Sequence, residues 1–139
     1  MKKKIIACVS VFWILIFGFV FKSFSSQDDK NIVTISPRAA SDLITQKKGD
    51  SDFVILDIRT PAEFNAGHIP NSILIDFYSK TFAEKIQQLD RTKTYLVYCR
   101  SGNRSRRSLE LFKKLKFRKV YHMDSGIIGW KSEGLPIIK

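Results

Sequence analysis

One cysteine of the chain has neighbours that would make its thiol reactive. Cys99 is followed by a short loop with two arginines and a glycine, and the glycine allows the backbone to curl so that successive N–H groups point inward. Inward N–H groups and nearby positive charge bind anions and lower the pKa of a thiol from its usual value of about 8.5. We therefore predict a nucleophilic thiolate in an anion-binding loop, whose residues are Arg100, Ser101, Gly102, Asn103, Arg104 and Ser105.

A packing role is the alternative for Cys99, because a cysteine at the end of a strand can also act as a small buried hydrophobe. The composition of the loop favours the reactive thiol, since cysteines of low pKa occupy electropositive, partly exposed sites. The other cysteine, Cys8, lies in an apolar segment at the N-terminus. The domain that holds Cys99 therefore cannot form an internal disulfide, and a lone thiol in an oxidising compartment is a liability unless it is used or buried.

Strand-like and helix-like segments alternate after residue 31, which is typical of a parallel sheet covered by helices. The strand that leads into Cys99 is expected at 94–98, and a helix is expected at 104–115, directly after the loop. Parallel sheets place ligand sites at the carboxyl ends of their strands, and a helix N-terminus adds unpaired N–H groups there. The other strands are expected at 32–35, 53–56, 72–75 and 120–122.

Three patterns predict where the other helices begin. Ser36-Pro37 has the form of an N-cap with proline in the first helical position, and Thr60-Pro61 predicts the start of a second, short helix. The segment Thr81 to Glu84 (Thr-Phe-Ala-Glu) has the form of a capping box, in which the threonine and glutamate side chains satisfy two backbone N–H groups.

Three ordered motifs resemble the signatures of the rhodanese family of sulfurtransferases. The segment Cys99–Ser105 (CRSGNRS) resembles the active-site loop of that family. Residues 57–72 resemble its N-terminal signature, D-x-R…EF…GHI-x-x-[AS], and residues 126–136 (Gly…Trp…Gly-Leu-Pro) resemble its C-terminal one. The resemblance implies an α/β fold of the rhodanese type, with a five-stranded, mainly parallel sheet and helices on both faces.

The resemblance also implies roles for individual residues. Cys99 would accept a sulfane sulfur and become a persulfide, and the backbone N–H groups of Arg100 through Ser105 would cradle the outer sulfur. Arg100 and Arg104 would attract a small anionic donor such as thiosulfate, and cyanide, a small thiol or a thioredoxin-like protein would accept the sulfur. Asp57 and Arg59 would be supporting residues that hold neighbouring loops through an ion pair.

Other polar and aromatic residues are expected to be structural. His68 and His122 lack the spacing of a metal site with Cys99, and a thiolate that is already ionised needs no base. We therefore expect neither a metal nor another cofactor. Trp130 is predicted to pack in the core, and Ser125 departs from the family, which commonly has a second glycine at that position, so this turn could be shifted slightly.

Two other functions are compatible with a thiolate in an anion-binding loop. Cysteine-based phosphatases and arsenate reductases also use one, but protein tyrosine phosphatases need Cys-x5-Arg, whereas Cys99 and Arg104 are spaced as Cys-x4-Arg. The shorter loop suits a single sulfur better than a tetrahedral oxyanion. The second alternative is a rhodanese fold used for redox sensing or partner binding, although inactive members of the family typically lose the cysteine that this chain retains.

The first 25 residues are predicted to be a signal peptide or an N-terminal membrane anchor, followed by a linker at 26–31 and the rhodanese domain at 32–139. Residues 5–21 form an uncharged apolar run after three lysines. Small residues favour cleavage after Ser25, whereas Lys22 and the bulky aromatic residues favour retention as an anchor. In either case we expect export, with the domain in the periplasm or on the extracytoplasmic face of the membrane.

Composition and charge limit the remaining function classes. A length of 139 residues favours one domain, and 44% hydrophobic with 27% charged residues is typical of a globular protein. The formal net charge of +11 favours small anions and acidic surfaces as partners. Nucleic acid is not expected, because few aromatic residues lie among the basic residues of the Cys99 loop and the helix that follows.

Overall fold

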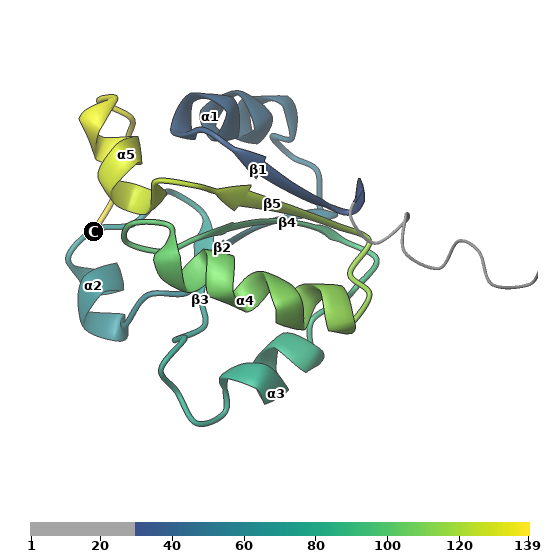
Figure 1. Cartoon of the computed structure of the whole chain (residues 1–139). Helices are drawn as coiled ribbons and strands as arrows, with labels where there is room; N and C mark the ends of the chain where they lie inside the picture. Colours follow the sequence, from purple (N-terminus) through teal and green to yellow (C-terminus); the bar gives the residue numbers. More distant parts are fainter. Residues whose placement is uncertain (1–29) are drawn as a thin grey trace, which may run out of the picture.

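The computed structural model describes residues 30–139, which form a five-stranded sheet with strand order β1-β5-β4-β2-β3 (Figure 1). Each neighbouring pair of these strands is parallel, so the sheet is entirely parallel where the sequence predicted a mainly parallel one. Strand β4 is central, and its carboxyl end lies between those of β5 and β2. The bounds are β1 Ile32–Ile35, β2 Phe53–Asp57, β3 Ser72–Leu74, β4 Thr94–Tyr98 and β5 Lys119–Met123.

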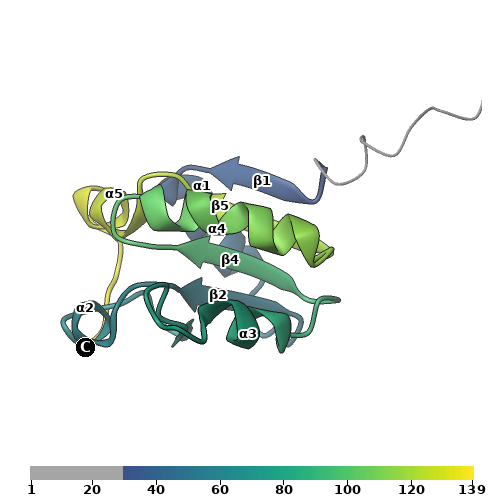
Figure 2. The same cartoon turned by 60° about the horizontal axis from the view of Figure 1, so that its bottom comes forward.

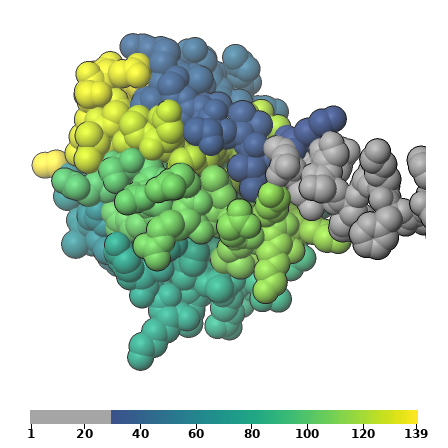
Figure 3. Space-filling model, viewed as in Figure 1, coloured from purple at the N-terminus to yellow at the C-terminus, as the bar shows by residue number. Residues whose placement is uncertain are grey.

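Helices cover both faces of the sheet, as the resemblance implied. Helices α3 and α4 pack on one face, and α1 and α5 pack on the other (Figures 1 and 2). Figure 3 shows the long surface of α4 in green, with the blue α1 and yellow α5 side by side above it and the teal α3 below. The bounds are α1 Pro37–Gln46, α2 Pro61–Asn65, α3 Phe82–Gln87, α4 Asn103–Lys114 and α5 Gly126–Ser132.

Two apolar cores lie on opposite faces of the sheet, and the central strand contributes to both. Tyr95 and Val97 of β4 are buried against α3 and α4, whereas Leu96 and Tyr98 are buried against α1 and α5. This alternation follows from the period of two along a strand, and it explains why the whole of 95–98 reads as an apolar run. Cys99 continues the alternation on the α3 and α4 side, where it belongs to the first core.

The predicted helix starts have different outcomes. Ser36 caps α1, because its hydroxyl accepts a hydrogen bond from the Ala39 N–H group at 3.2 Å. The capping box predicted at Thr81 is wrong: Thr81 has φ −100° and ψ 13°, not the extended backbone of an N-cap, and its hydroxyl pairs with that of Ser79 at 3.0 Å. A capping box is formed instead at Thr60, where Glu63 supplies the reciprocal hydrogen bond to the Thr60 N–H group.

The observed elements differ from the predicted ones mainly at their ends. Strand β5 is longer than the predicted 120–122, β3 is one residue shorter than the predicted 72–75, and β2 extends by one residue to include Asp57. Helix α5 was not predicted as a helix. Trp130 on this helix is buried as expected, and its indole N–H donates to the carbonyl oxygen of Pro136 at 2.9 Å.

The predicted export segment lies outside the described residues. Across 30–139, no helix combines the length and the apolar character that crossing a membrane requires. The signal peptide or anchor at 1–25 and the start of the linker at 26–31 therefore stay predictions.

Candidate active site

Cys99 follows the last residue of β4, at the edge of the sheet where the parallel strands end. Its side chain is 1% exposed, so the sulfur lies at the base of the loop rather than on the surface. The loop runs directly into α4, whose N-terminus directs unpaired N–H groups toward the sulfur. The predicted sequence of strand, cysteine, loop and helix is thus present.

The sulfur of Cys99 accepts hydrogen bonds from the loop. The Gly102 N–H group donates to Sγ at 3.2 Å, and the Ser105 hydroxyl lies 3.4 Å from it. Burial raises the pKa of the Cys99 thiol, but the Ser105 hydroxyl and the N–H groups of Ser105, Ser101 and Gly102 outweigh it, so the net pKa is lowered. Hydrogen bonds to the ionised form therefore favour a thiolate, even though the group is almost fully covered.

The curl of the loop depends on Gly102. Its φ of +89° lies in the left-handed region, and a Cβ atom at this position would overlap the carbonyl oxygen of Asp124. Any other residue would meet both obstacles at once. Because it has no side chain, Gly102 can adopt this conformation and place its own N–H group against the Cys99 sulfur.

His122 lies behind the loop and contacts it directly. Its Nε2 is 2.9 Å from the Ser105 hydroxyl oxygen and 3.2 Å from the Gly102 carbonyl oxygen. Sequence reasoning placed His122 among the structural residues and did not connect it to Cys99. The available signal was its position at the end of the last strand, because the carboxyl ends of neighbouring parallel strands meet at one edge. His68 instead pairs with the Phe64 carbonyl oxygen at 3.0 Å and stacks on the Phe64 ring.

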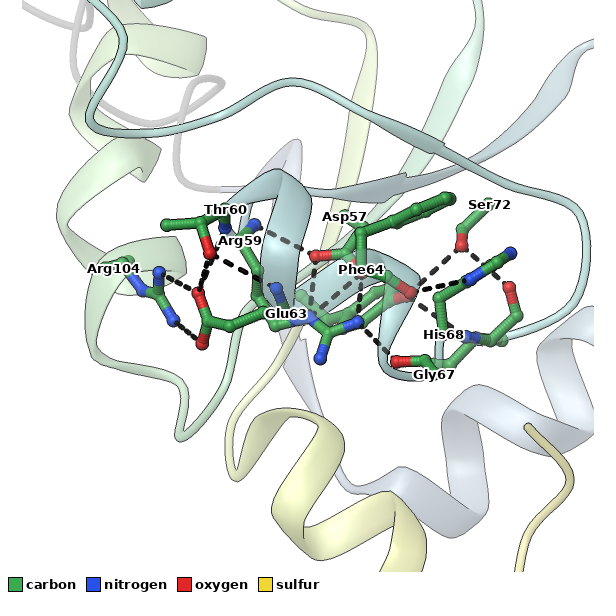
Figure 4. Close-up of polar contacts among 11 residues, drawn as sticks. Asp57, Arg59, Thr60, Glu63, Phe64, Gly67, His68, Ser72 and Arg104 are labelled. Atoms are coloured by element: carbon green, nitrogen blue, oxygen red, sulfur yellow. Dashed lines mark hydrogen bonds and ion pairs between the residues drawn. The ribbon is translucent and has the colours of Figure 1, made fainter. Parts of the chain in front are cut away.

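Arg104 is paired with a carboxylate across the active-site loop (Figure 4). Its guanidinium donates two hydrogen bonds to Glu63 of α2, at 2.8 and 2.7 Å. The Glu63 carboxylate also accepts from the N–H group and hydroxyl of Thr60 at 3.0 Å each. Arg104 therefore clamps the loop onto α2, and its predicted part in attracting a donor stays a prediction.

A polar cavity of about 410 Å³ opens beside the loop. Arg100 is exposed at this cavity, and Arg107 of α4 lines it as well, with its guanidinium over the Phe77 ring at 5.3 Å. The rest of the lining comes from Glu63, Tyr78, Ser101, Asn103 and Arg104. Three arginines against one carboxylate give this cavity a positive field, which favours a small anion.

The ion pair predicted between Asp57 and Arg59 is present, and it is buried (Figure 4). The Arg59 guanidinium donates to the Asp57 carboxylate at 2.6 Å and to the Gly67 carbonyl oxygen at 2.8 Å. The two side chains are 4% and 0% exposed, so neither charge is solvated. The pair joins the end of β2 to the turn after α2, which makes it a supporting element of the scaffold and not a contact of the sulfur.

No group of three or more His, Cys, Asp or Glu side chains that could hold a metal ion occurs within 30–139.

Comparison with known proteins decides the family. Residues 36–133 match the model of the rhodanese-like domain. The chain belongs to the rhodanese family. A sulfurtransferase of Allochromatium vinosum is 31% identical over 99 residues, which cover 70% of this chain and 91% of that protein. The crystal structure of a rhodanese-related protein from Thermoplasma volcanium has a TM-score of 0.63 and 31% identity, and the match covers 76% of this chain and 97% of that one.

Several other relatives of this rhodanese are longer proteins, of which the chain spans 26% to 56%. One of them is a tRNA uridine(34) hydroxylase of Yersinia pestis, 31% identical over 107 residues that cover 70% of this chain and 30% of that protein. The rhodanese domain thus occurs in proteins whose names describe different activities.

The turn that departs from the rhodanese signature has ordinary backbone angles at Ser125. Ser125 has φ −100° and ψ 5°, which any residue can adopt, and its hydroxyl donates to the Asp124 carboxylate at 3.1 Å. The neighbouring Gly126 has φ +57°, and a Cβ atom there would lie within 2.6 Å of the carbonyl oxygens of Cys99 and Arg100. The signature therefore needs its glycine at 126, whereas a serine fits at 125.

The clamp between Glu63 and Arg104 predicts a pH dependence of stability in this rhodanese. The hydrogen bonds from Arg104 lower the pKa of Glu63 from its ordinary 4.5 to about 2. Because the folded pKa is the lower one, the clamp contributes its full stability above pH 4.5 and loses it as the pH falls toward 2. Glu63→Gln should lower the free energy of unfolding by about 1–2 kcal/mol at pH 7, a figure reduced for the partial exposure of the pair.

Urea unfolding of both proteins between pH 2.5 and pH 7 measures this effect. The two curves of stability against pH should converge in acid, while Glu84→Gln, at an exposed position of α3, should follow the wild type within about 0.5 kcal/mol. A difference between wild type and Glu63→Gln that is as large at pH 2.5 as at pH 7 would contradict the clamp.

Proposed function

We propose that this chain is a sulfurtransferase that carries a sulfane sulfur as a persulfide on Cys99. The observation that carries the proposal is a covered thiol whose sulfur accepts a hydrogen bond from the Gly102 N–H group at 3.2 Å and lies 3.4 Å from the Ser105 hydroxyl. Such a loop stabilises negative charge on the cysteine sulfur and on a second sulfur bound to it. Membership of the rhodanese family and a relative named sulfurtransferase support the same activity.

The first half of the reaction is a displacement at sulfur. The Cys99 thiolate attacks the sulfane sulfur of thiosulfate, a bond forms between the two sulfurs, and the sulfur–sulfur bond of the donor breaks. Sulfite leaves with the electron pair, and the negative charge of the thiolate passes to the outer sulfur of the persulfide. The N–H groups of the loop, represented by Gly102, then face the two-sulfur anion in place of the thiolate.

The second half regenerates the thiolate. A nucleophile such as cyanide attacks the outer sulfur of the persulfide and leaves with it as thiocyanate, while the Cys99 sulfur retains the bonding electron pair. A thiol acceptor would leave as a persulfide in the same way. Cys99 is the only cysteine among the described residues, so no other cysteine of residues 30–139 can take the sulfur from it.

The shape of the site favours a small, slender donor. Cys99 is only 1% exposed, so a terminal sulfur atom reaches it more readily than a bulky tetrahedral ester. Arg100 and Arg107 border the cavity outside the loop and would attract a dianion such as thiosulfate. Phosphatase chemistry is less well supported, because the arginine at Cys-x4-Arg donates to Glu63.

Paired turnover assays test the proposal on one preparation of protein. We expect thiocyanate to form from thiosulfate and cyanide, with no release of nitrophenol from p-nitrophenyl phosphate above background. Hydrolysis of the phosphate ester without thiocyanate formation would replace sulfur transfer by phosphatase activity. Absence of both, with a Cys99 that peroxide oxidises reversibly, would favour the redox-sensing role instead.

We also propose, from the sequence alone, that the protein is exported and acts in the periplasm or on the outer face of the membrane. A membrane anchor would add a membrane partner, and a small thiol or a thioredoxin-like protein would be the acceptor in that compartment. Sequencing the N-terminus of protein recovered from membrane and soluble fractions separates the two forms. Cleavage after Ser25 predicts Ser26 as the first residue, whereas an anchor predicts a membrane-bound chain that retains residues 1–25.

A further inference from the structure

His122 lies at the centre of a chain of polar contacts that ends on the reactive sulfur. The side chain comes from β5 and is 3% exposed. Its Nε2 faces the Ser105 hydroxyl oxygen at 2.9 Å and the Gly102 carbonyl oxygen at 3.2 Å. The other ring nitrogen, Nδ1, lies 3.4 Å from the Thr34 hydroxyl of β1.

The neighbours of His122 determine which ring nitrogen carries the hydrogen. The Gly102 carbonyl oxygen can only accept, so the Nε2 atom that faces it carries the hydrogen and Nδ1 accepts from Thr34. Burial lowers the pKa of His122, and the charges of Asp124 and Arg106 act on it in opposite directions. The ring is therefore neutral near pH 7, with a single N–H group directed at the loop.

The Ser105 hydroxyl has two acceptors within reach, the Cys99 sulfur and the Gly102 carbonyl oxygen. Because Nε2 donates, the Ser105 oxygen accepts from it and cannot donate to it. The Gly102 carbonyl oxygen, 3.1 Å from the same hydroxyl, already faces the N–H groups of Arg106 at 3.0 Å and His122. The anionic sulfur of Cys99 carries a full negative charge, so it is the stronger of the two acceptors and takes the Ser105 hydrogen.

We propose that His122 is a positioning residue, whose Nε2–H group directs the Ser105 hydroxyl onto the Cys99 sulfur and thereby keeps that sulfur ionised. The inference rests on the proposed function only in taking Cys99 as the nucleophile. It assigns to the β5 histidine an effect on reactivity exerted entirely through Ser105. A histidine that merely fills space would leave the ionisation of Cys99 unchanged.

The pH dependence of Cys99 alkylation by iodoacetamide measures the ionisation without any sulfur transfer. His122→Leu and His122→Asn remove the donor at the Nε2 position, since the asparagine side chain is too short to reach it. Both should raise the apparent pKa of Cys99 by about one, which makes alkylation about tenfold slower below the midpoint. His122→Gln can place an amide N–H group near the position of Nε2 and should keep the midpoint within about 0.3 of the wild type.

The Ser105→Ala background separates this role from a structural one. Ser105→Ala should itself raise the apparent pKa of Cys99, and adding His122→Asn to it should cause no further change. Circular dichroism and urea midpoints identify any variant that fails to fold. If His122→Leu does not fold, the comparison of His122→Asn with His122→Gln still tests the proposal. An unchanged midpoint in a folded His122→Asn protein, or equal shifts with and without Ser105, would overturn the proposal. Failure of thiosulfate turnover with the predicted alkylation shifts would instead count against the proposed function alone.

Discussion

Replacing Cys99 with serine is expected to abolish sulfur transfer, with a fall in thiocyanate production of at least about 10³-fold. The serine hydroxyl fits the space of the thiol and keeps its contacts with Gly102 and Ser105, but it does not ionise near neutral pH and does not form a persulfide. The fold should survive, because the change removes no apolar volume of consequence from the core. Thiocyanate formation from thiosulfate and cyanide measures the loss.

Cys8→Ser is the matched control, since Cys8 is the only other cysteine of the chain. That variant should keep the wild-type rate within about twofold, because its position lies outside the rhodanese-like match at residues 36–133. Residual turnover in Cys99→Ser above a tenth of the wild-type rate would mean that another group accepts the sulfur.

Gly102→Ala is expected to have the second largest effect. The added methyl group has to adopt a φ of +89° and also overlaps the carbonyl oxygen of Asp124, so the loop and the turn after β5 cannot both keep their positions. We expect a loss of at least about 3 kcal/mol in the free energy of unfolding. Turnover should fall by at least about 100-fold, because the N–H group of residue 102 no longer meets the sulfur.

Gly49→Ala separates the cost of a left-handed φ from the cost of the overlap with Asp124 that arises at Gly102. Gly49 has a φ of +83°, close to that of Gly102, but a Cβ atom there would meet nothing within 4 Å. The alanine should cost about 1 kcal/mol through the backbone alone and leave turnover unchanged. Urea unfolding and thiocyanate assays on both variants give the comparison, and equal effects at the two positions would show that the contact with Asp124 has no part in shaping the loop.

The positions that the sequence predicted correctly are those fixed by local patterns. Short apolar segments that alternate with helix-like ones predicted the five strands. The run 94–98 before Cys99 predicted the central strand, because a strand buried on both faces is apolar along most of its length. The ion pair of Asp57 and Arg59 was implied by the resemblance to the rhodanese family, and it forms between side chains two residues apart at the end of β2. Ser36 before Pro37 was sufficient to locate the start of α1.

The contacts missed by the sequence prediction join residues that are far apart in the chain. Glu63 and Arg104 are separated by 41 residues, and their pairing depends on α2 lying against the start of α4. Ser105 and His122 meet because β5 is the neighbour of β4, which follows from the strand order and not from either local motif. The capping box predicted at Thr81 is absent because the turn before α3 gives Thr81 backbone angles that differ from the extended ones of an N-cap. The local sequence pattern does not determine that turn.

Mass spectrometry of the purified protein after treatment with thiosulfate tests the persulfide on Cys99 most directly. A persulfide on Cys99 predicts a gain of about 32 Da, confined to the peptide that contains Cys99, absent from Cys99→Ser and removed by cyanide with release of thiocyanate. A chain that gains no sulfur, or gains it on a peptide that does not contain Cys99, would contradict it.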